Sequence, residues 1–381
     1  MAAICALRAT AFIKTHSISR CAQRLFSEKR KVERVKEWRK KKLQDPHASK
    51  GIQTPSEIED LRDDQGVGAL LNGIVIERQG DRLLVEVTDQ TVNTTEHEHE
   101  EEERFVVCSQ KKSSLVNANI VVGDRIQFRR IIASGSSSSS EGVAVSFKER
   151  RNMLERPVSS NANSLQMKQI AANIDQMVIV TCCQPVVPLV SIDRYLVIAT
   201  QLNMTALIVL NKNDLNCSAE FYHYLSHYPS LGYNILKVSN SGEGIPLLQS
   251  HLVNKTSIFV GQSGVGKSSL INLILPEANI RTGGLTQKVQ MGSHTTSNAR
   301  LHHLSSGGDL IDSPGIREFG LWHLDRASIE EGFTEIHAAS KLCKFRNCKH
   351  SEAELGCAVR ARYNAGLINR YRLKHYFELT S

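Results

Sequence analysis

The sequence predicts a multidomain protein in which a small β-barrel, an α/β domain and a helical domain follow one another along 381 residues. Three observations support this fold class. Short apolar segments separated by turns, with no long helical pattern, fill residues 66–157. Apolar strand patterns then alternate with helical patterns over residues 158–324, which is typical of an α/β domain. Residues 325–381 combine a predicted helix with a cluster of cysteine and histidine residues.

The N-terminal segment has the composition of an organellar targeting peptide. Residues 1–27 contain no Asp or Glu but carry Arg and Lys among Ala, Ser, Thr and apolar residues. This pattern predicts a transit peptide, which we interpret as mitochondrial, with a chloroplast peptide or a disordered cytosolic tail as alternatives. Residues 28–50 are highly charged and predict a solvated linker, with a short helix or an RNA-contacting arm as alternatives.

The overall composition sets broad limits on partners. Hydrophobic residues make up 41% of the chain, which is enough for buried cores. The formal net charge of +8 favours a nucleic-acid partner, although a basic soluble protein without such a partner fits as well. No apolar run is long enough to cross a membrane, so we expect no membrane association. We also expect a monomer.

The segment from residue 66 to residue 157 predicts a five-stranded barrel of the OB type. Strand-like runs at residues 73–77 and 82–87 flank the turn Arg78-Gln79-Gly80-Asp81, which is a hairpin signal. Two further short strands are predicted at residues 104–108 and 124–130. OB-type barrels bind nucleic acid on an open strand face, but many small barrels bind only protein.

Two low-complexity segments interrupt this barrel. Residues 96–103 alternate His with Glu, a pattern that resembles a metal site. Because closely spaced like charges repel one another, we interpret this segment as a solvated loop. Residues 134–140 are serine-rich and predict a flexible loop. Residues 149–157 are then expected to close the barrel and lead into the α/β domain.

The α/β domain contains a specific motif, GxxxxGK[ST], between an apolar run at residues 257–260 and a helical pattern. Strand, loop and helix in this order predict a phosphate-binding loop, with a ligand-free glycine-rich turn as the alternative. Backbone N–H groups and the helix N-terminus would bind phosphate oxygens. Lys267 would reach the β- and γ-phosphates, and Ser268 would bind Mg²⁺. The predicted nucleotide-binding residues here are Gly261, Gln262, Ser263, Gly264, Val265, Gly266, Lys267, Ser268 and Ser269.

A second motif, Asn211-Lys212-Asn213-Asp214, follows the apolar run at residues 206–210 and reads NKxD. The Asp214 carboxylate can accept hydrogen bonds from N1 and the exocyclic amine of guanine. Adenine lacks this pair of donors and would leave a buried carboxylate unpaired. NKxD alone is compatible with a plain turn. Together with the phosphate loop, it predicts a guanine-nucleotide site and disfavours an ATPase or small-molecule kinase.

The order of the motifs is not that of ordinary GTPases, in which the phosphate loop comes first. Here NKxD precedes the phosphate loop, and Ser239 follows a strand-like run where a loop backing the base would lie. The sequence therefore predicts a circularly permuted GTPase. Such a permutation leaves the site intact if the old termini lay close together on the surface.

Two further segments predict the parts that contact the γ-phosphate. A strand-like run ends in Asp312-Ser313-Pro314-Gly315, where Asp312 would hold Mg²⁺ through water and the Gly315 amide would meet the γ-phosphate. Residues 292–296 form a polar loop suited to a switch. Many GTPases orient the attacking water with a Gln after the DxxG glycine, but Ile316 at this position cannot do so.

The nearest candidate for the missing Gln is His294 in the switch loop. Its imidazole would orient or polarise water if the loop closes over the γ-phosphate. The alternative is that His294 only stabilises the closed loop. Thr295 or Thr296 would bind Mg²⁺ in the closed state.

Nine cysteines occur in the chain, and three of them lie near the C-terminus with a histidine. Cys343, Cys348, His350 and Cys357 match the ligand set of a closed tetrahedral Zn²⁺ site with a structural role. Scattered free cysteines are the alternative, and a disulfide framework is not expected in a reducing compartment. Cys182 and Cys183, on or just after an apolar strand, are interpreted as structural thiols.

Basic residues follow the cysteine cluster on a predicted helix with one acidic residue, Glu378. They indicate either contact with RNA phosphates or a solvated helix face. These residues are Arg360, Arg362, Arg370, Arg372 and Lys374.

Together these motifs resemble the RsgA (YjeQ) family of circularly permuted GTPases, which act in maturation of the small ribosomal subunit. The resemblance runs from about residue 66 to residue 381. It depends on the segments NKND, GxSGVGKSSLIN, HTT and DSPGIREFG, on the run Arg-Asn-x-Leu-x-Arg and on the Cys/His cluster. It implies an RNA-binding barrel, a catalytic role for His294, and Thr296 as the Mg²⁺ ligand. The implied partners are GTP, GDP and the small ribosomal subunit with its rRNA.

The predicted organisation is therefore a transit peptide and linker (1–50), an OB-type β-barrel (66–157), a circularly permuted α/β P-loop GTPase domain (158–324) and a helical zinc-binding domain (325–381). We expect a GTP hydrolase that uses Mg²⁺, holds one structural Zn²⁺ and turns over slowly until it meets the small subunit. The alternative is an RNA-binding scaffold whose nucleotide stabilises the fold and is rarely hydrolysed.

Overall fold

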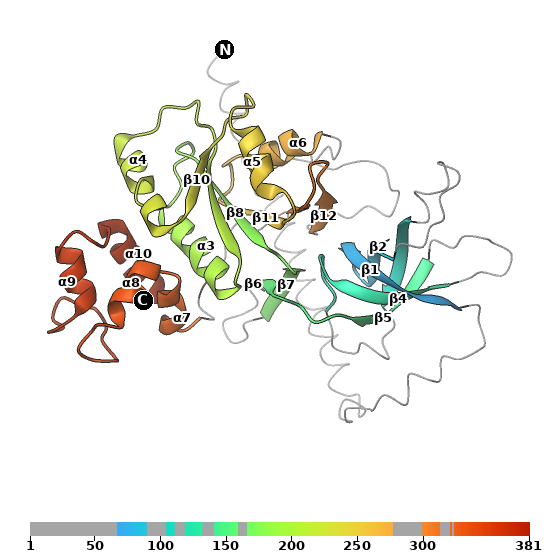
Figure 1. The fold of residues 1–381 in the computed structure, drawn as a ribbon, viewed down its shortest axis with the longest axis horizontal. Coiled ribbons are helices and arrows are strands. Elements are labelled where there is room, and N and C mark those ends of the chain that lie inside the picture. The colour runs from blue at the N-terminus through green and yellow to red at the C-terminus, as the bar shows by residue number, and fades with distance from the viewer. Residues whose placement is uncertain are drawn as a thin grey trace, which may run out of the picture. The chain divides into compact units, whose positions relative to one another are not determined.

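A computed structural model describes residues 67–89, 104–110, 119–131, 141–158, 166–276, 299–312, 321 and 324–381 (Figure 1). Several sequence predictions lie outside these ranges: the transit peptide and linker, the His/Glu segment, the serine-rich segment and the switch loop.

The first strands form a closed barrel. They are β1 (Val67–Gln79), β2 (Arg82–Val87), β3 (Phe105–Gln110), β4 (Arg125–Ile131) and β5 (Glu141–Phe147). Their order is β1-β2-β3-β5-β4, and β4 pairs again with β1. β3 and β5 are parallel, whereas the other neighbours are antiparallel. This arrangement confirms the predicted OB-type barrel.

An ion pair connects Asp124, which directly precedes β4, to Arg150, which lies in the segment after β5. The Asp124 carboxylate is fully buried and accepts hydrogen bonds from Arg150 Nε at 2.7 Å and from the Val121 N–H at 2.8 Å. The turn before Asp124 contains Gly123 at φ +85°, where a Cβ would lie 2.3 Å from the Ala172 carbonyl oxygen. The prediction that residues 149–157 close the barrel is wrong: the pairing of β1 with β4 closes it, and the strand Met153–Val158 pairs with Gln166–Ala172 in a separate sheet.

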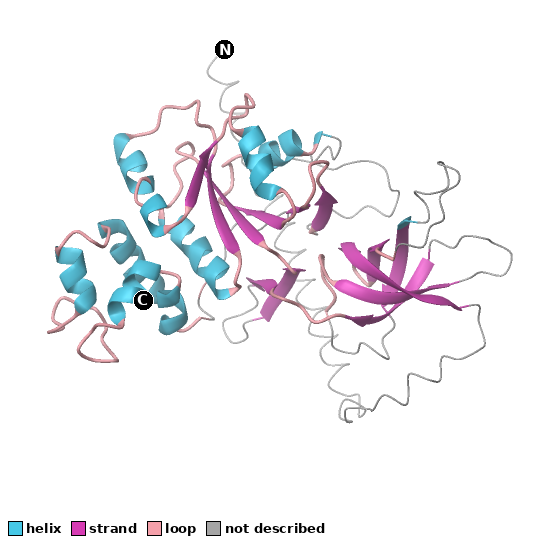
Figure 2. Cartoon of the chain, in the orientation of Figure 1, coloured by secondary structure: helices cyan, strands magenta, loops and turns pink. Residues whose placement is uncertain are grey.

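The α/β domain is built on a parallel sheet. Its strands lie in the order β10-β9-β8-β11-β13, and β12 joins the edge antiparallel to β13. They span Gln176–Thr181 (β8), Thr205–Leu210 (β9), Asn234–Lys237 (β10), Thr256–Val260 (β11), Arg300–His303 (β12) and Asp309–Asp312 (β13). Figure 2 draws the strands in magenta and the helices in cyan. The strands β6 (Met153–Val158) and β7 (Gln166–Ala172) form a separate antiparallel pair.

Helices cover both faces of this sheet. They are α3 (Val190–Gln201), α4 (Ala219–Leu225), α5 (Ile245–Leu252) and α6 (Lys267–Ile274), with a short 3₁₀ turn at Pro229–Leu231. Alternate side chains of β8 enter two separate cores: Val178 and Val180 pack with α5 and α6, whereas Met177 and Ile179 pack with α3. All residues of β8 are buried, as expected for a central strand of a parallel sheet that helices cover on both faces.

The edge strand β12 also contacts the barrel. Glu77 of β1 is paired with Arg300 of β12, so the barrel and the parallel sheet share hydrogen-bonded strands. His303 at the end of β12 contacts Glu86 of β2 through Nε2 at 2.5 Å and Asp309 of β13 through Nδ1 at 2.7 Å.

The C-terminal helices are α7 (Arg326–Glu331), α8 (Thr334–Ser340), α9 (Ala358–Asn364) and α10 (Arg370–Thr380). Arg372 of α10 is fully buried and donates to Asp193 of α3 at 2.7 Å and to Glu335 of α8 at 2.7 Å. The predicted basic helix face is therefore wrong for Arg372, because the buried carboxylate of Asp193 and the half-buried carboxylate of Glu335 draw this guanidinium inward. None of the helices in the described ranges is long and apolar enough to span a membrane.

Candidate guanine-nucleotide site and metal site

The phosphate loop lies between the end of β11 and the start of α6, as predicted. Gly261 has φ +144°, and a Cβ there would lie 2.2 Å from the Val180 carbonyl oxygen. Gly266 has φ +93°, and a Cβ there would lie 2.3 Å from Asn211 Nδ2. Neither position can carry a side chain, because the loop packs against neighbouring backbone and against the NKxD motif.

Lys267 folds back over the loop that it follows. Its Nζ donates to the carbonyl oxygens of Gly261 at 2.7 Å and Gln262 at 2.8 Å. The ammonium group therefore already lies over the phosphate loop. Gln262, Ser268 and Ser269 are half-buried, Ser263 and Gly264 are exposed and Val265 is buried.

Asp312 ends β13, the strand next to β11. Burial raises the pKa of the Asp312 carboxyl, and the positive charge of Lys267 acts against this shift. The two predicted phosphate-site residues therefore lie close enough to interact electrostatically. A nearby Mg²⁺ would stabilise the ionised form of this buried carboxylate. The Asp312 carboxylate and the Ser268 hydroxyl are oxygen ligands of the kind that Mg²⁺ prefers, so these residues fit the metal.

The NKxD motif contacts the phosphate loop directly. Asn211 is buried, its N–H donates to the Thr181 carbonyl at 2.8 Å and its Nδ2 donates to the Val265 carbonyl at 2.8 Å. Lys212 Nζ donates to the Gly264 carbonyl at 2.9 Å. The structure thus brings together two motifs that the sequence places in permuted order.

One atom of Asn211 fits a ligand-binding role. Its Oδ1 is buried and has no hydrogen-bond partner among the residues that the structure describes. A buried acceptor without a partner is costly unless a donor reaches it. A nucleotide bound between the two motifs is one source of such a donor.

The remaining base-reading residues lie beside Asn211. The Asn213 N–H donates to the Val238 carbonyl at 3.0 Å, which places the NKxD loop against the loop that contains Ser239. Ser239 is fully buried and shares a hydrogen bond with the Ser241 hydroxyl. Asp214 is exposed in this structure, whereas the sequence analysis expects its carboxylate to be buried. The carboxylate would become buried when a bound guanine base covers it.

Four predicted site residues lie outside the described residues, namely His294, Thr295, Thr296 and Gly315. Their roles stay predictions from the sequence.

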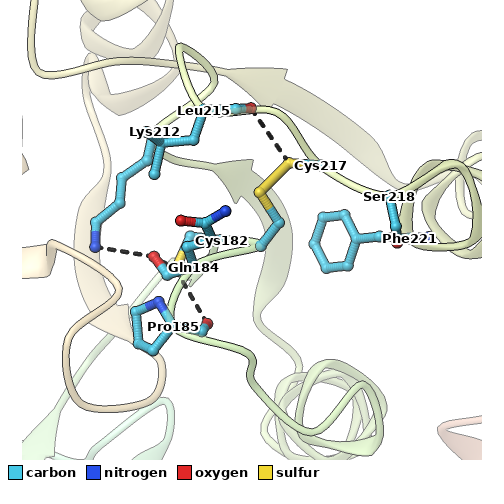
Figure 3. Close-up of a disulfide and its surroundings, with 9 residues drawn as sticks. Cys182, Gln184, Pro185, Lys212, Leu215, Cys217, Ser218 and Phe221 are labelled. Carbon is cyan, nitrogen blue, oxygen red and sulfur yellow. Dashed lines mark hydrogen bonds between the residues drawn. A yellow bond between two sulfur atoms is a disulfide. The ribbon is translucent and has the colours of Figure 1, made fainter.

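The interpretation of Cys183 as a structural thiol is wrong. Cys183 forms a disulfide with Cys217, whose Cα lies 5.4 Å away (Figure 3). Cys182 is a buried free thiol, as expected. The sequence signal for the disulfide was slight: one cysteine follows β8, and the other comes three residues after Asp214 in the loop after β9.

The C-terminal cysteines and histidine form one compact group. The ligand atoms of Cys343, Cys348, His350 and Cys357 all lie within 4.8 Å of one another. His350 Nδ1 lies 3.4 Å from Cys357 Sγ, and the sulfur atoms of Cys343 and Cys357 are 3.9 Å apart. Tetrahedral Zn²⁺ with Zn–S bonds of about 2.3 Å separates its sulfur ligands by about 3.8 Å. The geometry and chemistry of this donor set therefore fit a tetrahedral metal.

A second layer of contacts orients this group. His350 Nε2 contacts Glu330 Oε2 at 3.1 Å, which leaves Nδ1 facing the cysteines. Burial alone would raise the pKa of Glu330, but hydrogen bonds, first among them the one from His350, lower it to about 2. Arg360 Nε donates to the His350 carbonyl at 2.6 Å. The prediction that Arg360 belongs to a basic helix face is wrong in this respect, because its guanidinium turns to the His350 carbonyl. The positioning role of Glu330 has no signal in the sequence, because Glu330 is not a metal ligand.

Comparison with known proteins agrees with this geometry. A family model described as RsgA GTPase matches residues 147–322. The small ribosomal subunit biogenesis GTPase RsgA of Hahella chejuensis is 38% identical over 358 residues, which are 92% of this chain and 95% of that protein. The protein of the same name from Histophilus somni is 43% identical over 307 residues, covering 78% of this chain and 85% of its own length.

Solved structures show the same likeness. YjeQ from Thermotoga maritima matches with a TM-score of 0.60 and 26% identity, covering 82% of this chain and 98% of that one. YloQ, a circularly permuted GTPase, matches with a TM-score of 0.59 and 25% identity, covering 82% of this chain and 94% of its own. The resemblance seen in the motifs is confirmed: the chain belongs to the RsgA family of circularly permuted GTPases.

Proposed function

We propose that this protein hydrolyses GTP during maturation of the small ribosomal subunit. The observation that carries the proposal is the direct contact between the NKxD motif and the phosphate loop, made by Asn211 and Val265 at 2.8 Å. The names of its relatives from Hahella chejuensis and Histophilus somni supply the ribosomal role.

Each part of the nucleotide has residues to bind it. Asp214 accepts hydrogen bonds from guanine, with the Ser239 loop behind the base. Backbone N–H groups of residues 261–266 and the Lys267 ammonium bind the phosphates. Ser268 and Asp312 hold Mg²⁺, which neutralises charge on the phosphate oxygens when bound.

His294 orients the attacking water in this proposal, because Ile316 cannot replace the Gln of other GTPases. Thr296 completes the Mg²⁺ site when the switch loop closes. Hydrolysis is therefore slow in the isolated protein and accelerates when contact with the ribosomal subunit places His294 beside the γ-phosphate.

The other two domains serve binding to the subunit. The OB-type barrel supplies a strand face suited to RNA, and the net charge of +8 favours phosphate contacts. Cys343, Cys348, His350 and Cys357 hold one structural Zn²⁺, since four protein ligands leave no open position for catalysis. The protein acts as a monomer without membrane attachment.

We place the protein in the mitochondrion, with the chloroplast as the alternative. The acidic-free, arginine-bearing composition of residues 1–27 supports this assignment. A fusion of residues 1–50 to a fluorescent reporter tests it: mitochondrial import is expected, and a diffuse cytosolic signal would contradict it.

Phosphate release measured with and without purified small ribosomal subunits tests the function. We expect slow GTP hydrolysis alone, at least a tenfold rise (about 1.4 kcal/mol in activation free energy) with small subunits, and no rise with large subunits. A rate that small subunits leave unchanged would contradict the proposal and favour the RNA-binding scaffold. Lys267→Ala is the matched control, because it removes the phosphate-binding ammonium and should abolish release in both conditions.

A further inference from the structure

The disulfide between Cys183 and Cys217 joins the loop after β8 to the loop that contains the NKxD motif (Figure 3). Cys183 lies on the loop after β8, and Cys217 ends the loop that begins with the NKxD motif after β9. The two cysteines are 34 residues apart in the chain. The disulfide therefore connects the NKxD loop, which follows β9, to the loop that follows the adjacent strand β8.

The loop after β8 also adjoins the phosphate loop. Lys212 Nζ donates to the Gln184 carbonyl at 3.0 Å and to the Gly264 carbonyl at 2.9 Å, bridging the two loops. A Cβ on Gly264 would lie 3.2 Å from Pro185 Cγ, so these loops are in van der Waals contact. The disulfide thus belongs to a small connected unit formed by the loop after β8, the NKxD loop and the phosphate loop.

Asp214 lies between two anchors of the base-reading loop. On one side, the Asn213 N–H donates to the Val238 carbonyl at 3.0 Å. On the other side, Cys217 is held by the disulfide. Beyond it, Ser218 caps α4 by accepting a hydrogen bond from the Phe221 N–H at 3.2 Å. Breaking the S–S bond removes the covalent anchor nearest to Asp214 on its C-terminal side and widens the range of positions open to its carboxylate.

The disulfide is reachable by a reductant, and the adjacent thiol does not compete with it. Cys183 and Cys217 are both half-buried, which leaves part of each residue open to solvent. Cys182 is buried, donates to the Gln184 carbonyl at 3.1 Å and has a pKa raised by burial, so it is a poor nucleophile for exchange. Disulfides in reducing compartments are usually transient, catalytic or redox-sensing.

We propose that Cys183 and Cys217 form a reversible redox site that sets the affinity of this protein for guanine nucleotides. The inference rests on the guanine-nucleotide site proposed above. A dithiol reductant attacks one sulfur through its thiolate, forms a mixed disulfide and is then released as a cyclic disulfide by its second thiol. Two electrons and two protons pass to the protein, which gains two free thiols. The oxidised form holds Asp214 in place and binds GDP more tightly than the reduced form.

Titration of zinc-loaded full-length protein with fluorescent GDP tests this, after equilibration in either oxidised or reduced dithiothreitol. We expect the Kd to rise at least about fivefold on reduction, the lower end of coupling between two protein sites. The double variant Cys183→Ser, Cys217→Ser should show the weaker affinity in both conditions. Cys182→Ala should keep the full redox shift.

Several results would overturn the proposal. An equal Kd for the oxidised and reduced wild-type protein would do so without any variant, even if the serine variant failed to fold. A shift of the same size in the double variant would assign the effect to other thiols, such as the zinc ligands, whose metal content is measured in parallel. A non-reducing peptide map without the Cys183–Cys217 link would also overturn it. If neither form bound GDP, the guanine-nucleotide site itself would be refuted, which is distinguishable from loss of the redox shift alone.

Discussion

The side-chain amide of Asn211 donates to the main-chain carbonyl of Val265 at 2.8 Å, although the two residues are 54 positions apart. This hydrogen bond connects the NKxD motif to the phosphate loop. It explains how a permuted chain order still brings the two motifs together: β8 lies between β9 and β11, and the loops after all three strands meet at the same edge of the parallel sheet.

Replacing Arg372 by Met should destabilise the protein by about 3 to 5 kcal/mol, because it takes the guanidinium away from the buried Asp193 carboxylate. His375 and Tyr228 remain as hydrogen-bond partners of this carboxylate. Arg372 is fully buried and also holds Glu335. Urea unfolding of the two proteins measures the difference. The control Arg362→Met changes an exposed side chain on α9 and should stay within about 0.5 kcal/mol of wild type. Equal stability of the two variants would show that the buried charge network does not hold α10 in place.

His303 should make stability depend on pH. Its hydrogen bond to Asp309 raises its pKa above the usual value against the effect of burial, and Glu86 adds to the rise. A raised histidine pKa contributes stability that is fully present below about pH 6.5, the ordinary value. This contribution is lost as the pH rises through the folded-state pKa. The deficit of His303→Gln relative to wild type should therefore be larger at acidic than at alkaline pH in denaturant unfolding.

His302 provides a control of opposite sign. Burial lowers the pKa of His302 to about 4, with the charges of Arg300 and His303 adding to the effect. Wild-type protein should lose stability relative to His302→Gln as the pH falls below about 6.5. If the stability difference from wild type changed with pH in the same direction for both variants, this account of the β12 contacts would be contradicted. Arg104 Nε also donates to Glu86 at 2.7 Å, so Glu86 keeps a cationic partner in His303→Gln.

Cys343→Ser should remove the metal from the C-terminal group and loosen the loop that carries His350. Elemental analysis of purified protein should find about one Zn²⁺ per wild-type chain and a large loss in the variant, since structural sites use four protein ligands. The control variant Cys108→Ser changes a cysteine in the core of the barrel, far from the cluster in sequence, and the protein should keep its zinc. Unchanged zinc in Cys343→Ser would exclude this cluster as the site.

His294→Ala should lower subunit-stimulated hydrolysis by about a hundredfold and leave the Kd for GTP unchanged, because the group acts on water and not on the nucleotide. Single-turnover hydrolysis and nucleotide titration separate these two effects. A normal stimulated rate would remove His294 from the mechanism.

Features that depend on residues close together in the chain could be predicted from the sequence. The phosphate loop needs glycines at Gly261 and Gly266, and the structure places both at positive φ against backbone or side-chain atoms. The metal ligands lie within a short segment, so their grouping followed from spacing alone. The barrel was predictable because its strands are separated by clear turn signals.

Contacts between distant parts of the chain were beyond sequence reasoning. Arg372 looked like one member of a basic helix face, and its burial depends on Asp193, which lies 179 positions away. The disulfide of Cys183 depends on the way β8 and β9 lie side by side, which brings two loops together. The residues around Arg372 do not distinguish a buried arginine from an exposed one, and those around Cys183 do not distinguish a disulfide from a free thiol.

Calorimetric titration of the full-length protein with Mg-GDP and with Mg-ADP tests the central claim most directly. The site proposed between the NKxD motif and the phosphate loop should bind GDP at least about a hundredfold more tightly than ADP. Asp214→Ala should lose this preference without loss of folding, since Asp214 is exposed. Equal binding of the two nucleotides by the wild-type protein, or no heat with GDP, would contradict the account.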